Sequence, residues 1–407
     1  MYPKVRFRGF DEPWKKVKLG RNVKRIRRKN KNLETNIPLT ISAQFGLVDQ
    51  RDFFGRVVAS ENLANYILLK RGEFAYNKSY SKEAPYGSIK RLEKYNEGAL
   101  STLYIAFTPE NINSDFLKAF FDTTKWYSHI VQVSTEGARN HGLLNISPQD
   151  FFEMSITIPK SDEQNNISRI YNLMNSLLSL QQRKLELEKQ LKFFLFQNAI
   201  PSKEAVIFKP KIRFREFQDK WKYAKLSEIY NTDCSGGTPS VKNKTFYGGN
   251  IPFLTISDLN NKKIYKTQKT LSKKGLENSS AKLVPAGSIS LAMYASVGKI
   301  GILSKEMATS QAFFNMTFDD DEKRDFIYII LEKANFDKEW IRLISTGTQN
   351  NLNAKKIRNF HIVFPTYKAL KGLNKLFCNI DTDIDIQYKV IVTTNQLKQF
   401  LLQNLFI

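Results

Sequence analysis

The sequence predicts a mixed α/β (α+β) fold in which two globular domains are separated by two long helices that form an antiparallel coiled coil. Three observations predict it: the first half recurs in the second as an internal pseudo-two-fold repeat, strand-like runs fill the middle of each half, and each half ends in a helical pattern. The predicted parts are a first globular domain over residues 1–159, a first spacer helix over 160–200, a second globular domain over 201–365 and a second spacer helix over 366–407.

The repeat is clearest where each half begins. Ten of the seventeen positions from Pro3 to Leu19 are identical in the segment from Pro210 to Leu226, where unrelated sequence would give about one identity. The two halves also end alike, since Phe194-Leu-Phe-Gln-Asn198 corresponds to Phe400-Leu-Leu-Gln-Asn404. The chain is therefore a duplicated unit of about 206 residues.

Short apolar runs punctuated by Gly and Pro predict strands in the middle of each half. Such runs occupy residues 37–42, 72–77, 251–256 and 288–291. After Pro159 the pattern changes, because a long stretch without Pro or Gly begins with Ser161 and Asp162, which are N-cap residue types. We therefore expect a helix from this point to Ala199, and its copy after Pro365.

The apolar residues of the first helix follow steps of three and four, which is typical of a coiled-coil seam. The predicted seam, with Lys184 as its polar position, consists of Ile170, Leu173, Leu177, Leu180, Leu187, Leu191 and Phe194. A lone helix would leave this seam in water, so pairing with the second helix is expected. The alternative is that each helix packs separately on its own domain.

The second helix repeats this pattern less regularly. Its apolar positions are Leu373, Leu376, Phe377, Ile380, Ile384, Ile386 and Ile391. Asp381, Asp383 and Asp385 interrupt them, which predicts a break in the coiled coil at these residues.

The composition indicates a folded, strongly basic chain. Of 407 residues 42% are hydrophobic, which excludes wholesale disorder, and 63 Lys and Arg against 39 Asp and Glu give a formal charge of +24. Such an excess favours a polyanionic partner. No apolar run approaches the ~20 residues of a membrane-spanning helix, and residues 1–20 contain no apolar signal-peptide core. Two Cys without a Cys-x-x-Cys motif exclude a disulfide framework, and we expect a cytoplasmic protein.

No catalytic or metal-binding pattern is found in the sequence. The one Gly-Lys pair, at Gly298, is followed by Ile300 rather than Ser or Thr, and no Gly-x-Gly-x-x-Gly occurs. There is no Asn/Asp-Pro-Pro-aromatic segment and no Glu-x-Lys triplet. His129, His141 and His361 share no motif with one another or with a Cys. We therefore predict no catalytic residue and no bound metal.

One segment of the first half concentrates positive charge suited to DNA phosphates. It contains no acidic residue and has seven cations, Arg21, Lys24, Arg25, Arg27, Arg28, Lys29 and Lys31. A solvated charge run is the alternative, but the excess charge of the whole chain favours nucleic acid.

Further polar residues near predicted strand ends are candidates for contact with base edges. In the first half these candidates are Asn77, Lys78, Tyr80, Lys90 and Arg91. In the second half they are Ser235, Gly236, Gly237, Thr238, Lys242, Lys244, Tyr294, Ser296 and Lys299. The glycines would let the backbone approach a ligand closely, although glycines in such segments more often only make turns.

The order of several motifs, present twice, resembles one known family. These motifs are Arg6-Phe-x-x-Phe10 with Trp14, its copy Arg213-Phe-x-x-Phe217 with Trp221, Gly72-Glu-Phe-Ala-Tyr-Asn-Lys78, Gly236-Gly-Thr-Pro-Ser240 and Val284-Pro-Ala-Gly287. In this order they resemble the specificity subunit of type I restriction-modification systems, over essentially the whole chain.

The resemblance implies two target-recognition domains, each reading one half of a split double-stranded DNA sequence. It implies that the helices set the spacing and hold two copies of the modification (adenine methyltransferase) subunit, and a restriction subunit is expected as well. S-adenosylmethionine, ATP and Mg would then belong to partners, and this chain would be non-catalytic and bind no cofactor. The alternatives are a self-sufficient DNA-acting enzyme with an unrecognised centre and a nonspecific basic DNA-binding protein.

Overall fold

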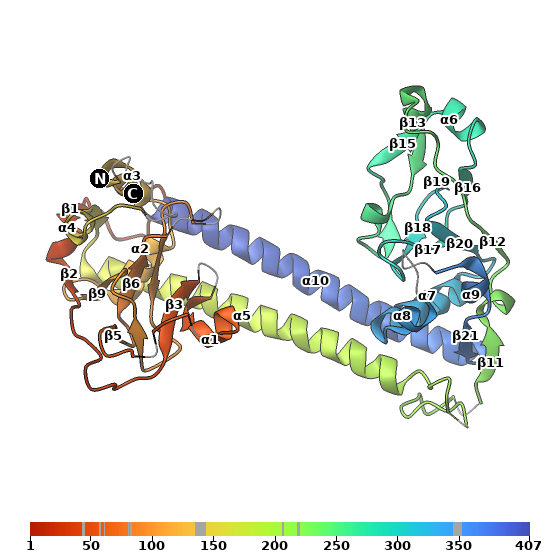
Figure 1. The fold of residues 1–407 in the computed structure, drawn as a ribbon, viewed down its shortest axis with the longest axis horizontal. Coiled ribbons are helices and arrows are strands. Elements are labelled where there is room, and N and C mark those ends of the chain that lie inside the picture. Colours follow the sequence, from red (N-terminus) through yellow and green to blue (C-terminus); the bar gives the residue numbers. More distant parts are fainter. Residues whose placement is uncertain are drawn as a thin grey trace. The chain divides into compact units, whose positions relative to one another are not determined.

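The computed structural model describes residues 1–42, 45–56, 58–60, 62–79, 81, 84–134, 144–205, 207–217, 220–344 and 352–407 (Figure 1). They form two compact units. Unit 1 comprises Met1–Arg183 with Tyr388–Ile407, and unit 2 comprises Lys184–Gln387. Each unit therefore contains one globular half together with a segment of each of the two long helices.

The described residues of unit 1 form two four-stranded sheets and a two-stranded one. The first, antiparallel throughout, has the order β2 (Val23–Arg25), β9 (Ile105–Pro109), β6 (Phe74–Asn77) and β7 (Ser88–Arg91). The second has the order β4 (Gly46–Asp49), β3 (Pro38–Ser42), β8 (Glu97–Leu100) and β5 (Ile67–Lys70), with β3 and β8 parallel. The third pairs β1 (Lys15–Lys18) with β10 (Ser155–Ile158).

Short helices complete unit 1, and several of them contribute to its core. They are α1 (Gln50–Phe54), α2 (Ser114–Phe121), α3 (Tyr127–Val133) and α4 (Pro148–Phe152). The helix α2 begins where the Asn113 side chain accepts hydrogen bonds from two backbone N–H groups, and its buried face carries Phe116, Phe120 and Phe121. Aromatic rings thus supply much of this core, as in the stacked pair of Phe74 and Phe107.

Unit 2 has the corresponding sheets. Its larger sheet has the order β12 (Thr232–Cys234), β20 (Phe313–Thr317), β17 (Ile289–Ala292), β18 (Ile300–Leu303) and β14 (Lys263–Ile264). The next has the order β15 (Lys269–Leu271), β13 (Tyr247–Phe253), β19 (Met307–Thr309) and β16 (Lys282–Val284), and the last pairs β11 (Lys222–Lys225) with β21 (His361–Phe364). Its helices are α6 (Lys273–Glu277), α7 (Asp321–Phe336), α8 (Glu339–Leu343) and α9 (Ala354–Arg358).

The duplication seen in the sequence is present in the topology. Both four-stranded sheets with a parallel central pair, β3–β8 and β13–β19, have antiparallel strands on either side. The backbone agrees in detail, because Leu19 N–H donates to Met154 O at 2.8 Å and its copy Leu226 N–H donates to Phe360 O at 2.8 Å. Among the described residues the clearest difference between the sheets is β14, the fifth strand of the larger sheet in unit 2.

The long helices α5 (Ser161–Asn198) and α10 (Tyr367–Leu405) each have a segment in both units and pair in opposite directions. In unit 1 the start of α5 packs on the end of α10, where Lys398 Nζ donates to Asn175 Oδ1 at 2.7 Å. In unit 2 the end of α5 packs on the start of α10, where Phe196 and Phe377 stack with centroids 5.1 Å apart. The helices therefore pair, and the alternative of separate packing is not what the chain adopts.

Six of the seven apolar residues predicted for the seam of α5 were wrong, although the pairing itself was right and Ile170 lies half-buried against α10. Leu173, Leu177 and Leu180 are 59%, 44% and 69% exposed, and Leu187, Leu191 and Phe194 are also exposed. The buried contact face instead follows Ile167, Tyr171, Leu178 and Leu195. Both stripes have the spacing of a coiled coil, and the inner one was overlooked because the polar residues Gln181, Glu188 and Lys192 interrupt it.

The three aspartates do not interrupt α10 itself, which is one continuous helix from Tyr367 to Leu405. Asp381 faces inward and forms ion pairs with Lys192 at 2.6 Å and with Lys262 at 3.4 Å. These ion pairs offset the cost of burying part of its charged carboxylate. Asp383 and Asp385 are exposed, and Ile386 is exposed as well, at 48%. In the part of the chain that the structure describes, no helix has the length and apolar character needed to cross a membrane.

Candidate nucleic-acid interface

The densest basic segment, from Arg21 to Lys31, lies on β2 and the strand-like chain that follows it, and much of its charge is already engaged. Arg28 pairs with the partly buried Glu73, and Lys29 Nζ donates to Asn65 O at 2.8 Å. Lys24 lies 3.7 Å from Glu110, which follows β9. Among the described residues, the exposed side chains of Arg27 and Lys31 make no ion pair.

Arg25 and Arg27 are cations close together in this segment. Burial and the neighbouring charge of Arg27 lower the pKa of Arg25, which nevertheless stays protonated at neutral pH. Arg21 is exposed at the end of a short 3-10 turn, where its carbonyl accepts from Asn111. A phosphate placed between Arg25 and Arg27 would relieve their repulsion, so this part of the segment retains the electrostatic character of an anion site.

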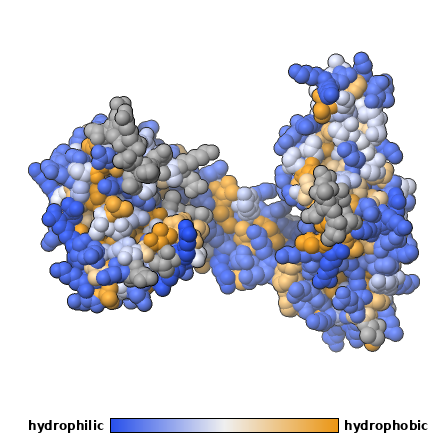
Figure 2. Space-filling view, in the orientation of Figure 1, coloured by the Kyte–Doolittle hydropathy of each residue, from blue (hydrophilic) through white to orange (hydrophobic). Residues whose placement is uncertain are grey.

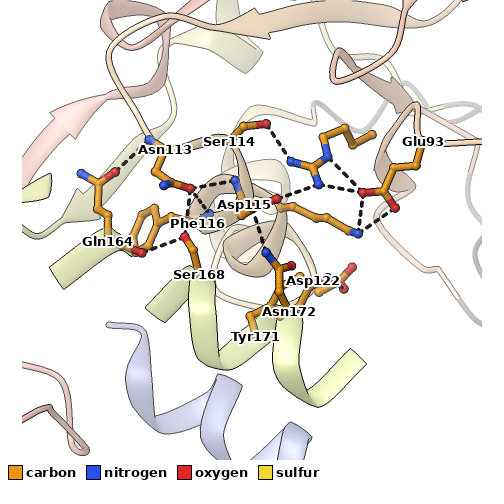
Figure 3. A network of polar contacts seen from close by, with 12 residues as sticks. Glu93, Asn113, Ser114, Asp115, Phe116, Asp122, Gln164, Ser168, Tyr171 and Asn172 are labelled. Carbon is orange, nitrogen blue, oxygen red and sulfur yellow. Dashed lines mark hydrogen bonds and ion pairs between the residues drawn. The ribbon is translucent and has the colours of Figure 1, made fainter. Parts of the chain in front are cut away.

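Lys90 and Arg91, by contrast, take part in a polar network that joins β7 to α2 and α5. Figure 3 shows the part of this network where Asn172 of α5 meets Asp115 of α2. Lys90 pairs with Asp122 at 3.0 Å, and the side chain of Arg91, 14% exposed, pairs with Glu93 and Asp115, each at 2.7 Å. Asn172 of α5 donates to the same Asp115 at 2.8 Å. These two cations therefore hold the sheet against the long helix.

The remaining candidates of unit 1 lie at the end of β6. The amide oxygen of Asn77 accepts from Ser79 N–H at 3.0 Å, which makes a local turn. Burial lowers the pKa of Lys78, whose ammonium lies 3.4 Å from Ile146 O. Tyr80 lies outside the described residues.

In unit 2 the candidate glycines serve close packing of segments. A Cβ on Gly236 would lie 1.9 Å from Thr309 O, and one on Gly237 would lie 1.8 Å from the Ser280 hydroxyl, so neither position has room for a side chain. Ser235 lies before them, and Thr238 donates to Gln311 at 2.9 Å. These contacts bring the Gly-Gly turn beside β19, and Lys242 follows it with an exposed side chain, as does Lys244.

Tyr294, Ser296 and Lys299 lie in the turn between β17 and β18. Ser296 O accepts from Lys299 N–H at 3.1 Å, and Gly298, at φ +90°, packs against Trp340. Tyr294 packs on the core, whereas the Lys299 side chain is exposed. Of these three candidates, Lys299 is the one whose charge is presented to solvent.

Sequence reasoning missed most of the exposed lysines of unit 2. Between Ser235 and Glu306 the chain has eleven lysines and three acidic residues, a charge bias that local counting could have found. Exposed members without an acidic partner in the described structure include Lys263, Lys266, Lys269, Lys274, Lys282 and Lys305. They are spread over β14, β15, α6, β16 and the loops between strands, so they do not form one continuous basic segment in the sequence.

Within the described residues, no three His, Cys, Asp or Glu side chains gather as a metal site would require. His129 lies 2.8 Å from Asp150 O, and His361 stacks on Tyr223 with centroids 4.8 Å apart. Both histidines thus have structural contacts, and His141 lies outside the described residues.

Comparison with known proteins identifies one half of this arrangement directly. Residues 218–387 match the family described as the type I restriction modification DNA specificity domain. This part of the chain is similar to a type I DNA specificity domain. The resemblance expected from the motifs is thereby confirmed, and the specificity domain comprises nearly all of the second globular half and the start of α10. Unit 1 repeats its topology.

Curated relatives of the specificity domain are themselves specificity subunits. The type I restriction enzyme HindI specificity subunit of Haemophilus influenzae is 35% identical over 163 residues, 39% of this chain and 35% of that protein. The MjaIX specificity subunit of Methanocaldococcus jannaschii is 26% identical over 191 residues, 46% of this chain and 44% of that protein. The matching part of the chain thus spans less than half the length of either relative.

Two solved structures share the fold along nearly the whole chain. One, from a study of complex assembly and conformational transition of the type I R-M system, has a TM-score of 0.59 and 15% identity and covers 98% of both chains. The other is the type I restriction-modification S subunit from M. genitalium, with a TM-score of 0.58, 14% identity and coverage of 100% of this chain and 99% of that one. At these identities the likeness concerns the fold.

Proposed function

We propose that this chain is the specificity subunit of a type I restriction-modification complex. It reads a bipartite double-stranded DNA target and directs adenine methylation and restriction by partner subunits, and it has no catalytic centre of its own. Each globular half reads one half-site, and because the halves differ in sequence, the half-sites differ as well. The observation that carries the proposal is the specificity domain of residues 218–387 joined to a second copy of its topology.

Two sets of exposed cations are proposed to contact DNA. In unit 1 they are the unpaired members of the basic segment, Arg27 and Lys31, together with Arg21 and Arg25. In unit 2 they are Lys242, Lys244 and Lys299 with the lysines of β14, β15 and β16. A cation without a carboxylate partner can exchange its hydration for a phosphate at little cost, which supports this assignment.

The partners are proposed to be two copies of the modification subunit and a restriction subunit. The exposed apolar stripe of α5, which includes Leu177, Leu187 and Leu191, supports a protein partner on the long helices. Figure 2 shows hydrophobic residues gathered on the exposed surface of these helices. S-adenosylmethionine is assigned to the modification subunit and ATP with Mg to the restriction subunit, and the complex acts in the cytoplasm.

The first test separates this role from that of a self-sufficient enzyme. The purified chain is incubated with DNA, S-adenosylmethionine, ATP and Mg²⁺, with and without its modification subunit. We expect methylation of a split sequence only when both proteins are present. Methylation or cleavage by the chain alone would contradict the proposal, and binding without sequence preference would favour a nonspecific basic protein.

A second test concerns the helices as a ruler between half-sites. At ~1.5 Å per residue the 38 residues of α5 span about 57 Å. Inserting four residues near Leu180 should change the spacer length of the methylated target and leave both half-sites as they are. An unchanged spacer would exclude the ruler.

A further inference from the structure

The opening segment of the chain is clamped to the helix pair in unit 1 by one buried carboxylate. Arg6 donates to both oxygens of Glu163, from Nε and Nη2, at 2.8 Å each. Trp14 Nε1 donates to Glu163 Oε2 at 3.2 Å. The Glu163 side chain is 2% exposed, so this three-residue clamp satisfies a charge that burial would otherwise make costly.

Unit 2 has the same segment without the carboxylate. Arg213 and Trp221 are the copies of Arg6 and Trp14, but the copy of Glu163, at an offset of 206, is Ala369. Among the described residues, neither the Arg213 guanidinium nor Trp221 Nε1 has a hydrogen-bond partner. The clamp of unit 1 is therefore half present in unit 2, with its donors in place and its acceptor missing.

An apolar pocket of about 100 Å³ lies where the acceptor would be. Arg213 is the charged residue among those that line it, and the others include Phe214, Phe217, Trp221 and Leu373. The pocket is shaped by Gly372 inside α10, because a Cβ there would lie 2.9 Å from the Phe217 ring. A glycine in a helix interior costs about 1 kcal/mol relative to alanine, and here it makes room for the two phenylalanines.

The pocket of unit 2 also leaves its walls accessible. Ile212 and Phe214 are 42% and 39% exposed, whereas their copies in unit 1, Val5 and Phe7, pack against the core. The backbone anchor is nevertheless kept, because Ile212 N–H donates to Asn198 O at 2.9 Å, as Val5 N–H donates to Asn404 O at 3.1 Å. The segment thus has the same register in both units, and what differs is what fills the space beneath it.

The chemistry of the pocket defines its occupant. An engineered apolar cavity of about 150 Å³ accepts benzene, so this one has room for about one aliphatic side chain. Arg213 offers a planar pair of donors that match a carboxylate. A peptide segment with an Asp or Glu next to an apolar side chain satisfies both requirements, and nucleic acid, having no apolar side chain and no carboxylate, does not.

We propose that this pocket, between the opening segment of unit 2 and α10, binds a carboxylate-bearing apolar segment of the modification subunit. The inference rests on the proposed function, which supplies that partner. Continuity supports the choice, because Leu195 lines the pocket and Leu191, one helical turn earlier in α5 and 48% exposed, belongs to the apolar stripe assigned to the partner. Unit 1 fills the same position with Glu163, so the two copies of the modification subunit are held unequally.

The test fills the pocket with a larger side chain at Ala369, which lines it. Ala369→Glu places in unit 2 the carboxylate that unit 1 has, and Ala369→Ser is the matched control that leaves the pocket open. Native mass spectrometry counts the bound modification subunits, and calorimetry measures each affinity. We expect two copies on the unchanged chain and on A369S, and a loss of about ten- to a hundredfold at one of the two sites in A369E.

Two outcomes separate this inference from the proposed function. If two modification subunits bind to A369E with unchanged affinities, the inference about the pocket is wrong and the proposed function stands. If no modification subunit binds to the unchanged chain, both the inference and the proposed function are wrong. Arg213→Met provides a second arm if A369E fails to fold, because it keeps the apolar wall and removes the guanidinium. It should weaken the same single site about tenfold or more, and an unchanged affinity would again contradict the inference.

Discussion

The two globular halves share one topology but treat their positive charges differently. In unit 1, some of the predicted cations are paired with carboxylates, as Arg28 is with Glu73 and Arg91 with Asp115, whereas Arg27 and Lys31 have no acidic partner among the described residues. In unit 2, lysines scattered over several elements, such as Lys266 and Lys282, have no acidic partner in the described structure. Neighbouring carboxylates, more than local density, therefore decide which cations remain available for a polyanion.

The largest effect is expected where unit 1 has a carboxylate that unit 2 lacks. Glu163→Ala removes the acceptor of Arg6 and Trp14 and leaves a largely buried guanidinium unpaired. We expect a loss of about 3 kcal/mol in the free energy of unfolding of unit 1, measured by urea denaturation. Ala369→Glu, the reverse change in unit 2, should cost nothing or stabilise. Equal costs for the two variants would remove the contrast between the clamp and the open pocket.

The next effect separates structural cations from DNA-binding ones in unit 1. Arg91→Ala leaves Glu93 and Asp115 without their shared partner and should cost about 2 kcal/mol in unfolding free energy. The DNA affinity of the protein that remains folded should change little, because the Arg91 guanidinium donates to Ser114 and pairs with Asp115 of α2. A large loss of affinity with unchanged stability would instead place Arg91 at the DNA.

A third effect concerns the unpaired lysines of unit 2. Replacing Lys263, Lys266 and Lys269 together by Gln should weaken DNA binding by the full complex about tenfold at physiological salt, and the slope of log affinity against log salt should fall by roughly 0.9 for each phosphate that is no longer neutralised. Lys273→Gln is the matched control, because Lys273 already has Glu277 as a partner at 3.8 Å. Unchanged affinity in the triple variant would show that these lysines are only a solvated surface.

The smallest effect is a pH dependence that differs between the halves. Asp122 in unit 1 and Glu332 in unit 2 occupy corresponding positions of the repeat. Each lies six residues after a buried phenylalanine, which is Phe116 in unit 1 and Phe326 in unit 2. Burial acts to raise the pKa of Asp122, but the Lys90 ammonium and the Tyr171 hydroxyl outweigh it and lower that pKa. Burial raises the pKa of Glu332 against the attraction of Lys192, with Asp381 adding to the rise.

The sign follows from linkage. Asp122 stabilises unit 1 above the ordinary aspartate pKa of about 3.9, and this contribution is lost as the pH falls through its lower folded value. Folding disfavours the ionised form of Glu332. Protonation of Glu332 as the pH falls therefore first increases the free energy of unfolding of unit 2. At pH 7 Asp122→Asn should therefore lower the free energy of unfolding by about 1 kcal/mol more than Glu332→Gln does. This difference between the two variants should become smaller below about pH 4. A difference between the two variants that grows on acidification would contradict the opposite pKa shifts of Asp122 and Glu332.

The sequence predicted the duplication, the mixed fold and the paired helices, because these depend on patterns repeated over many residues. It could not locate the helix contact face, since the exposed stripe through Leu177 is more apolar than the buried one, which contains Gln181 and Lys192. The partner of Asp381 lies nearly two hundred residues away at Lys192, and such pairings are set by tertiary packing. The same holds for Lys90 and Arg91, whose carboxylates come from another element.

The central claim is that each half reads its own half-site, and a domain exchange tests it most directly. Residues 1–159 are replaced by the corresponding part of a relative with a different target, and methylated adenines are mapped in DNA from cells that express the hybrid with its modification subunit. We predict that one half-site changes while the other half-site and the spacer stay the same. A target that changes on both sides, or not at all, would contradict the claim.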